Sequence, residues 1–161
     1  PIVIAQHMQP NITSMFASRL AATFGLNVQE ARDNQLLTNG SIFIAPGDFH
    51  LGIKKVGSDL YTKITQSEKV NGHRPSADFL FESILEQGLA KSTLGIILTG
   101  MGGDGAKGLL GLKKNGSITI GQYEASCIVY GMPKVAFDLG AVDFQVSLDQ
   151  ISEKIYSLVN T

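Results

Sequence analysis

The chain has 161 residues, enough for one domain with a sizeable core, and 43% of them are hydrophobic, an ordinary share for a globular protein. Its 13 basic and 14 acidic residues leave a net charge of −1, which gives no electrostatic reason to expect nucleic acid as a partner. No apolar run approaches the roughly 18 residues of a membrane-spanning helix, so we expect no membrane insertion. The single cysteine, Cys127, excludes an internal disulfide and is typical of a reducing cytoplasm.

The first half of the chain alternates between strand-like and helix-like patterns. Asn11 is the expected N-cap of a first helix, and Gly25 is expected to end it. The residues assigned to the inner face of that helix are Met15, Phe16, Leu20 and Phe24. Apolar runs on both sides of the turn at residues 57–59 predict an antiparallel β-hairpin. The expected elements are strand 2–5, helix 11–24, strands 26–31 and 41–45, hairpin strands 49–56 and 60–65, and a helix that begins after residue 76.

The second half continues this alternation, which predicts right-handed βαβ units. The expected elements are strand 94–98, a helix that ends before residue 115, strand 118–120, helix 131–139, strand 142–146 and helix 148–159. The predicted fold class is therefore α/β: a doubly wound, mainly parallel sheet with helices on both faces and an antiparallel β-hairpin. We expect residues 1–161 to form a single domain.

A glycine-rich loop at residues 100–105, with the sequence GMGGDG, separates a strand from a helix. It fits the pattern G-x-G-x-x-G, and Glu124 follows about 20 residues later, as in dinucleotide-binding units. A dinucleotide-binding module is therefore one hypothesis. The carboxylate of Asp104 argues against it, because it would lie close to a bound phosphate of the same charge.

Asp104 itself has two interpretations. A side-chain carboxylate just before a helix can cap the first turn, which is worth roughly 1 kcal/mol. A carboxylate fixed in such a loop can also orient a catalytic imidazole and stabilise its protonated form. The two roles are compatible, and both remain open on local sequence alone.

The three histidines are His7, His50 and His73, and their spacing does not fit a metal site, so we expect no metal. His7 follows the first apolar strand, just as Asp104 follows the strand at residues 94–98. Since parallel strands end at the same edge of a sheet, these two side chains are expected to meet. His73 lies at another junction between a strand and a helix, where it either lines the same crevice or belongs to an ordinary loop.

A pair of histidine and aspartate needs a nucleophile. No serine of this chain lies in a G-x-S-x-G turn between a strand and a helix. Ser76 and Ser126 occur near strand ends, but capping or surface roles suit both of them better. Cys127 is flanked by apolar residues with no visible activating group, so we expect a buried, unreactive thiol.

Five segments, taken together and in order, resemble one family. They are residues 5–8 (AQHM), 45–48 (APGD), 73–76 (HRPS), 98–106 (LTGMGGDGA) and 124–133 (EASCIVYGMP). The chain is similar along nearly its whole length to the catalytic domain of the CheB-type chemotaxis protein-glutamate methylesterases. The resemblance implies a serine hydrolase that removes methyl groups from glutamate esters of methyl-accepting chemotaxis receptors and also deamidates receptor glutamines.

The resemblance also implies roles for individual residues. His7 matches the general base of the family and Asp104 its orienting acid. Met101 and Gly102 match the part of the crevice that is expected to support the oxyanion through backbone N–H groups.

The residues His73, Arg74 and Met132 match positions in family loops around the same site. We assign these three residues to substrate contact. No metal or organic cofactor is implied. The implied partners are the chemotaxis receptors, together with a receiver domain and a histidine kinase in the full system, and the implied location is the cytoplasm.

One part of the family pattern is missing from the sequence. The nucleophilic serine of the family precedes the histidine motif, but none of the six residues before His7 is serine. We therefore expect a truncated catalytic domain that lacks its first βα unit, its nucleophile and any receiver domain, and that is inactive by itself. A domain that only docks to a receptor is the remaining alternative.

Overall fold

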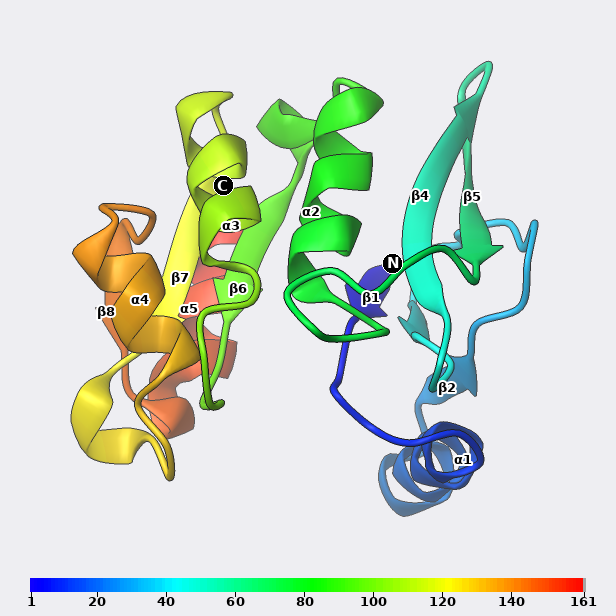
Figure 1. Ribbon diagram of the computed structural model, residues 1–161, viewed down its shortest axis with the longest axis horizontal. Helices are drawn as coiled ribbons and strands as arrows, with labels where there is room; N and C mark the ends of the chain where they lie inside the picture. Colours follow the sequence, from blue (N-terminus) through cyan, green and yellow to red (C-terminus); the bar gives the residue numbers. More distant parts are fainter. Residues whose placement is uncertain (161) are drawn as a thin grey trace. The chain divides into compact units, whose positions relative to one another are not determined.

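The computed structural model describes residues 1–160 and confirms the α/β class, with parallel strands, flanking helices and one antiparallel strand pair (Figure 1). Contacts between residues divide the chain into an N-terminal unit, Pro1–Gln87, and a C-terminal unit, Gly88–Thr161. Each unit has its own strands and helices. The prediction of a single domain over the whole chain stays a prediction.

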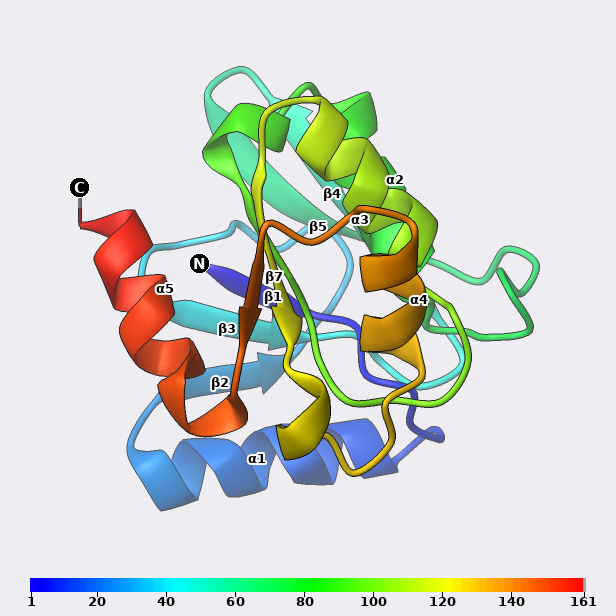
Figure 2. The ribbon, with the colours of Figure 1, turned by 90° about the vertical axis from the view of Figure 1, so that its left-hand side faces the viewer.

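In the N-terminal unit, three short strands form a parallel sheet in the order β1-β3-β2, and a hairpin forms a separate antiparallel pair (Figure 2). This antiparallel pair confirms the β-hairpin predicted from the apolar runs on both sides of residues 57–59. Helix α1 packs against β2, and α2 packs against β4. The elements are β1 (Ile2–Ile4), α1 (Ile12–Phe24), β2 (Asn27–Glu30), β3 (Ser41–Ile44), β4 (His50–Val56), β5 (Asp59–Thr65) and α2 (Ala77–Glu86).

The buried face of α1 agrees with the expected one only in part. Ala17 packs with Val28 and Ile44 in the core between the helix and the sheet, and the expected residues Phe16 and Leu20 pack against this cluster. Met15 and Phe24, by contrast, are 67% and 64% exposed, so their assignment to the inner face is wrong. Residues two positions apart on a helix lie on nearly opposite sides, so burial of Ala17 turns Met15 outward.

The helix ends in this unit agree only in part with the capping roles expected from the sequence. Gly25 adopts a left-handed conformation and donates its N–H to the carbonyl of Ala21, which ends α1 as expected. Ser76 caps α2, where its hydroxyl accepts a hydrogen bond from the N–H of Phe79 at 3.3 Å. Asn11 occupies the N-cap position of α1 but has a left-handed φ of 69°, and its side chain makes no capping bond.

In the C-terminal unit, three parallel strands lie in the order β6-β7-β8. Helices α3 and α4 cover one face of this sheet and α5 lies on the other (Figures 1 and 2). The elements are η1 (Ala90–Ser92), β6 (Leu94–Ile97), α3 (Ala106–Lys114), β7 (Ile118–Gln122), η2 (Glu124–Ser126), α4 (Met132–Asp138), β8 (Phe144–Val146), η3 (Leu148–Gln150) and α5 (Ile151–Val159).

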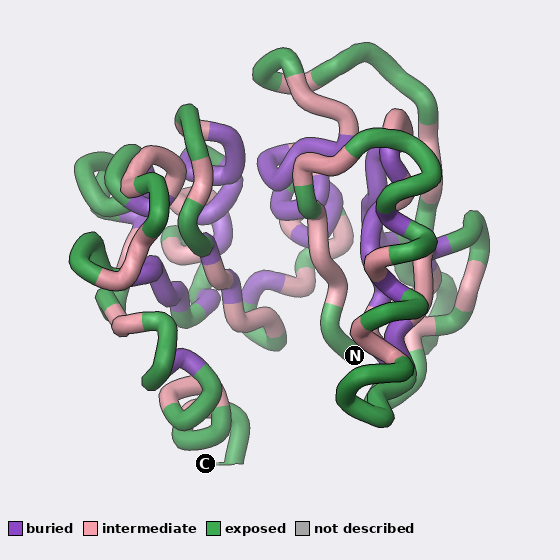
Figure 3. Tube along the Cα trace, turned by 90° about the horizontal axis from the view of Figure 1, so that it is seen from below, coloured by how far each residue is buried: buried purple, intermediate pink, exposed green. Residues whose placement is uncertain are grey.

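Close packing of α3 on β6 forms the centre of this unit. Leu109 and Leu112 are fully buried, and a Cβ built on Gly95 would lie 2.6 Å from the Cδ1 atom of Leu109. Glycine at position 95 therefore lets the helix approach the strand closely. Figure 3 shows that buried stretches of this kind run through both units and that most peripheral loops are exposed. Among residues 1–160, every helix is too short or too polar to cross a bilayer.

The carboxylate of Asp143, in the loop before β8, joins α3 and β7 of the C-terminal unit. Its Oδ1 atom lies 3.0 Å from the Nζ atom of Lys113, and its Oδ2 atom accepts hydrogen bonds from the N–H and the hydroxyl of Thr119. Partial burial acts to raise the pKa of Asp143. The hydrogen bonds from Lys113 and Thr119 outweigh this effect and hold the pKa below its usual value.

The contact between Gly95 and Leu109 can be tested with a double-mutant cycle. Gly95→Ala is expected to destabilise the protein by about 1–3 kcal/mol because its methyl group overpacks the core. Leu109→Ala is expected to cost about 2–5 kcal/mol because it leaves a cavity. The double variant should cost less than the sum, since the new methyl group enters the vacated space. Urea unfolding measures all three, and strict additivity would contradict the packing described.

The Asp143 network predicts a stability difference that depends on pH. Because folding lowers the pKa of Asp143, its ionised form stabilises the protein above the unfolded pKa of about 3.9, and this contribution is lost as pH falls through the folded pKa. Asp143→Asn should therefore lower the free energy of unfolding by up to about 1 kcal/mol at pH 7. The difference from wild type should shrink below about pH 4. A constant difference from pH 7 to pH 3 would argue against the ion pair.

Candidate functional site

His7 lies in the loop that follows β1, three residues beyond the end of the strand. Its ring stacks on the ring of His73, with 3.9 Å between centroids and an angle of 3° between planes. Both side chains are half-buried. The structure thus brings together two of the residues singled out in the sequence, although 66 positions separate them.

A tight turn holds the backbone of His73. Val70 and His73 exchange two backbone hydrogen bonds of 2.9 and 3.0 Å, and Asn71 and Gly72 between them have φ values of 53° and 80°. Positive φ at both central residues is the pattern of a type I′ turn, in which asparagine followed by glycine is strongly favoured.

Arg74 clamps the next part of the same loop. Its guanidinium donates to Oδ1 of Asp48 from Nε at 3.1 Å and from Nη2 at 2.7 Å, and it donates from Nη1 to the carbonyl of Ser67 at 2.7 Å. Gln66 donates to the second carboxylate oxygen of Asp48. The hydrogen bond from Arg74 is the main reason that the pKa of Asp48 lies below its usual value. The assignment of Arg74 to substrate contact stays a prediction.

The third histidine, His50, has a structural role. It is fully buried and stacks on Phe79 with 4.3 Å between ring centroids. Its Nδ1 atom accepts a hydrogen bond from the N–H of Ser76 at 3.3 Å, and its Nε2 atom lies 2.9 Å from the carbonyl of Glu68. Nε2 must therefore carry the proton that is donated to that carbonyl.

Asp104 lies in the glycine-rich loop between β6 and α3 of the C-terminal unit. Its side chain is almost completely buried, with 1% exposure. Helix α3 begins at Ala106, and its N-cap is Gly105, which has a φ of 87° and no side chain to cap with. The interpretation of Asp104 as the helix N-cap is therefore wrong. The pairing of this carboxylate with His7 stays a prediction.

The glycine-rich loop is anchored by the segment that leads into α4. The hydroxyl of Thr99 accepts from the N–H of Val129 at 2.9 Å and lies 3.1 Å from its carbonyl. The N–H of Gly100 donates to the same carbonyl, and the carbonyl of Gly100 accepts from the N–H groups of Gly131 and Met132. These backbone bonds hold the two segments together in the manner of a short parallel bridge.

Two glycines pack closely where these segments meet, and Gly131 is the one that faces backbone atoms. A Cβ on Gly100 would lie 2.5 Å from the sulfur of Met132, and a Cβ on Gly131 would lie 2.5 Å from the carbonyl oxygen of Gly100. Met132, predicted as a substrate-contact residue, therefore packs directly against the glycine-rich loop. Its role in substrate contact stays a prediction.

Sequence reasoning missed the buried side chain of Gln122, at the end of β7. Its Oε1 atom accepts from the N–H of Thr99 at 2.8 Å, and its Nε2 atom donates to the carbonyl of Ser126 at 2.7 Å. Gln122 thereby links the start of the glycine-rich loop to η2. Its only signal in the sequence is a polar residue at the end of an apolar strand.

Met101 and Gly102 form the exposed tip of the glycine-rich loop. The side chain of Met101 is 80% exposed, and Gly102 has a φ of 87°. Within the part of the chain that the structure describes, the backbone N–H groups of these two residues donate no hydrogen bond. They are therefore available to an oxygen atom that approaches from solvent.

The alternative nucleophiles within the chain have other roles. Ser76 is the buried cap of α2. The hydroxyl of Ser126 donates to the carbonyl of Tyr123 and accepts from the N–H of Leu148. Burial raises the pKa of the Cys127 thiol, and the charge of Glu124 raises it further, so this thiol is not activated.

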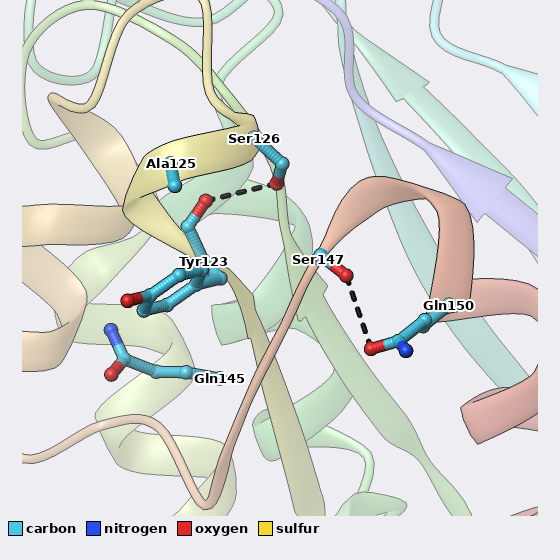
Figure 4. Close-up of a pocket in the computed structure, with 6 residues that line it drawn as sticks. All are labelled: Tyr123, Ala125, Ser126, Gln145, Ser147 and Gln150. Carbon is cyan, nitrogen blue, oxygen red and sulfur yellow. Dashed lines mark hydrogen bonds between the residues drawn. The ribbon is translucent and has the colours of Figure 1, made fainter.

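A shallow hollow of about 520 Å³ lies in the C-terminal unit, beside η2 and β8. Figure 4 shows that the hydroxyls of Ser126 and Ser147 at its edge are already hydrogen-bonded to neighbouring residues. Nothing in it resembles a nucleophile paired with a base. Nor do residues 1–160 bring together three or more histidine, cysteine or acidic side chains that could hold a metal ion.

Comparison with known proteins identifies the family. A sequence model described as CheB methylesterase matches residues 1–155. The protein-glutamate methylesterase/protein-glutamine glutaminase 2 of Syntrophomonas wolfei is 48% identical over 158 residues, which cover 98% of this chain and 46% of that protein. The protein of that name in Salmonella typhi, without the number, is 42% identical over 159 residues, which cover 99% of this chain and 45% of that protein. The chain thus spans about half the length of these relatives.

A solved structure agrees with these sequence matches. The crystal structure of the Thermotoga maritima CheB methylesterase catalytic domain superimposes with a TM-score of 0.94 at 39% identity, covering 98% of this chain and 83% of that chain. The resemblance found in the five sequence motifs is confirmed. The chain belongs to the CheB methylesterase family.

Proposed function

We propose that the intact protein containing this chain hydrolyses methyl esters of glutamate side chains on chemotaxis receptors and deamidates receptor glutamines. The observation that carries this proposal is the match, over 98% of the chain, to the solved CheB methylesterase catalytic domain. The names of the curated relatives support the two reactions. Both reactions are acyl transfers that leave a glutamate carboxylate, so one site can perform both.

In this proposal His7 is the general base and Asp104 the orienting acid. The nucleophile is a serine in the segment that precedes Pro1. His7 takes the serine proton while the serine oxygen attacks the ester carbonyl, and it then gives this proton to the departing methoxide, so that methanol leaves. In the second step His7 accepts a proton from the water that attacks the acyl-enzyme and returns it to the serine oxygen as the glutamate is released. Asp104 fixes the tautomer of the imidazole and stabilises the imidazolium that forms.

The oxyanion of the tetrahedral intermediate is assigned to the backbone N–H groups of Met101 and Gly102. Two features support this assignment. These donors have no partner among the described residues, and Gly100 holds the loop by donating to Val129 and accepting from Gly131 and Met132. Donors fixed before the reaction need no reorganisation as charge develops, and one such donor is worth roughly 3–4 kcal/mol of the barrier.

The proposed partners follow from the proposed reaction. The protein substrate is a chemotaxis receptor, whose helix regains a negative charge when an ester or amide becomes a carboxylate. A receiver domain and a histidine kinase are the proposed regulators, and the cytoplasm is the proposed location. The chain of residues 1–161 alone is proposed to be inactive, since the serine lies outside it.

The dinucleotide hypothesis has no specific observation in its favour. Glu124, which would bind a ribose, lies exposed in η2, and Asp104 puts a buried carboxylate in the loop that would have to hold a pyrophosphate. We expect millimolar NAD to leave the melting temperature unchanged. A saturable upward shift would revive this hypothesis.

The catalytic assignment can be tested in the full-length protein with a methylated receptor, by measuring methanol release. His7→Gln and Asp104→Asn should each lower kcat by roughly 10³–10⁴-fold. The first variant removes the base, and the second no longer fixes the tautomer of the His7 imidazole. Met15→Gln, on the exposed face of α1, is the matched control and should keep full activity. Melting temperatures show whether each variant is folded.

Other results would favour other interpretations. Full activity of a folded His7→Gln variant would refute the assignment of the base. Rapid turnover by residues 1–161 alone would refute the position of the nucleophile. Receptor binding without hydrolysis by the wild-type full-length protein would favour a docking role.

A further inference from the structure

The stack of His7 and His73 has no role in the proposed acyl-transfer mechanism. We propose that His73 is a positioning residue, which fixes the ring plane of the general base through face-to-face contact. This inference rests on the proposed function, since it needs His7 to be the base. It concerns only the N-terminal unit, in which the contact is observed.

The geometry of the pair indicates that the surrounding structure imposes it. Aromatic rings left to themselves prefer offset or edge-to-face arrangements, with centroids about 4.5–7 Å apart. His7 and His73 are nearly parallel with 3.9 Å between centroids, closer than that range. The backbones on both sides must therefore bring the rings together.

The backbone of His73 is well suited to this task. The type I′ turn fixes it on its N-terminal side through two hydrogen bonds with Val70. On its C-terminal side, Arg74 is fixed by Asp48 and Ser67, and the carbonyl of Arg74 accepts from the N–H of Asp48 at 3.2 Å. The ring of His73 thus projects from a segment that is held at both ends.

The backbone of His7 has weaker local support. It lies between the end of β1 and the start of α1, outside any helix or strand. Hydrogen bonds tie this segment down at the carbonyls of Ile4 and Gln9, before and after the histidine. A flat surface against one face of the imidazole restricts rotation about the side-chain bonds that the backbone leaves undetermined.

Stacking is compatible with the chemistry of a base. It uses the face of the His7 ring, whereas Nδ1 and Nε2 lie at the edge and point in the ring plane, where a base must reach its proton donor at about 2.6–3.2 Å. An aromatic face, which carries partial negative charge, also tolerates the imidazolium that forms during the reaction. His73→Phe should therefore preserve the stacking role of His73, and His73→Ala should lose it.

Two measurements on the full-length protein test this inference. Steady-state kinetics should give a kcat about tenfold lower for His73→Ala with a nearly unchanged KM, and a kcat within about twofold of wild type for His73→Phe. Proton NMR of ¹³C-histidine-labelled protein reports ring geometry without activity. The carbon-bound ring protons of His7, assigned with His7→Gln, should lose their upfield ring-current shift in His73→Ala and keep it in His73→Phe.

Lys69→Ala, an exposed change in the same loop, is the control and should alter neither kcat nor the shift. His73→Gln replaces His73→Ala if the alanine variant fails to fold. A kcat at the wild-type level in folded His73→Ala, or an equal loss of kcat in His73→Ala and His73→Phe, would overturn the positioning role. If His7→Gln keeps full activity, the proposed function fails instead, whatever the His73 variants do.

Discussion

Hydrogen bonds between the backbones of two loops, joined by the side chains of Thr99 and Gln122, hold the glycine-rich loop of the C-terminal unit. The carbonyl of Gly100 accepts hydrogen bonds from the N–H groups of Gly131 and Met132, and this close approach requires that Gly131 carries no Cβ. A strand that ends in glycines would otherwise be followed by a flexible loop, because glycine loses more conformational freedom on folding than any other residue. Hydrogen bonds to a later segment of the chain keep this loop ordered.

In the N-terminal unit, an ion pair holds a loop that likewise follows a strand. The loop between β3 and β4 carries Asp48, whose carboxylate receives two hydrogen bonds from Arg74 in the loop before α2. In both units, a loop that follows a parallel strand is held by a loop that enters a helix much later in the sequence. The residues proposed to take part in catalysis lie next to these contacts between loops, so each unit holds them on a well-fixed backbone.

Local patterns were enough to predict most elements of the fold. Strand and helix positions followed from apolar periodicity, and the hairpin followed from its turn. The errors have physical causes. On the inner face of α1, Phe16 and Leu20 pack against the core as assigned. Small Ala17 is the buried apolar residue there, while Met15 and Phe24 face solvent. Asp104 had the chemistry of a cap, but the helix begins two residues later, after a left-handed glycine.

Tertiary contacts lay beyond such patterns. Gln122 is an ordinary polar residue in the sequence, and only the path of the chain shows that it joins Thr99 to Ser126. The stack of His7 on His73 likewise depends on a turn and an ion pair that come from separate segments. Of the site, the sequence offered the residue types and their places at strand ends, while the partners of each side chain required the fold.

The lone thiol of the chain has a practical consequence for chemical labelling. Partial burial and the nearby Glu124 keep Cys127 protonated, and alkylating agents react with thiolates rather than thiols. Electrophiles aimed at cysteine will therefore modify this chain slowly at neutral pH. An organophosphonate that captures activated hydroxyl groups will therefore meet little competition from Cys127.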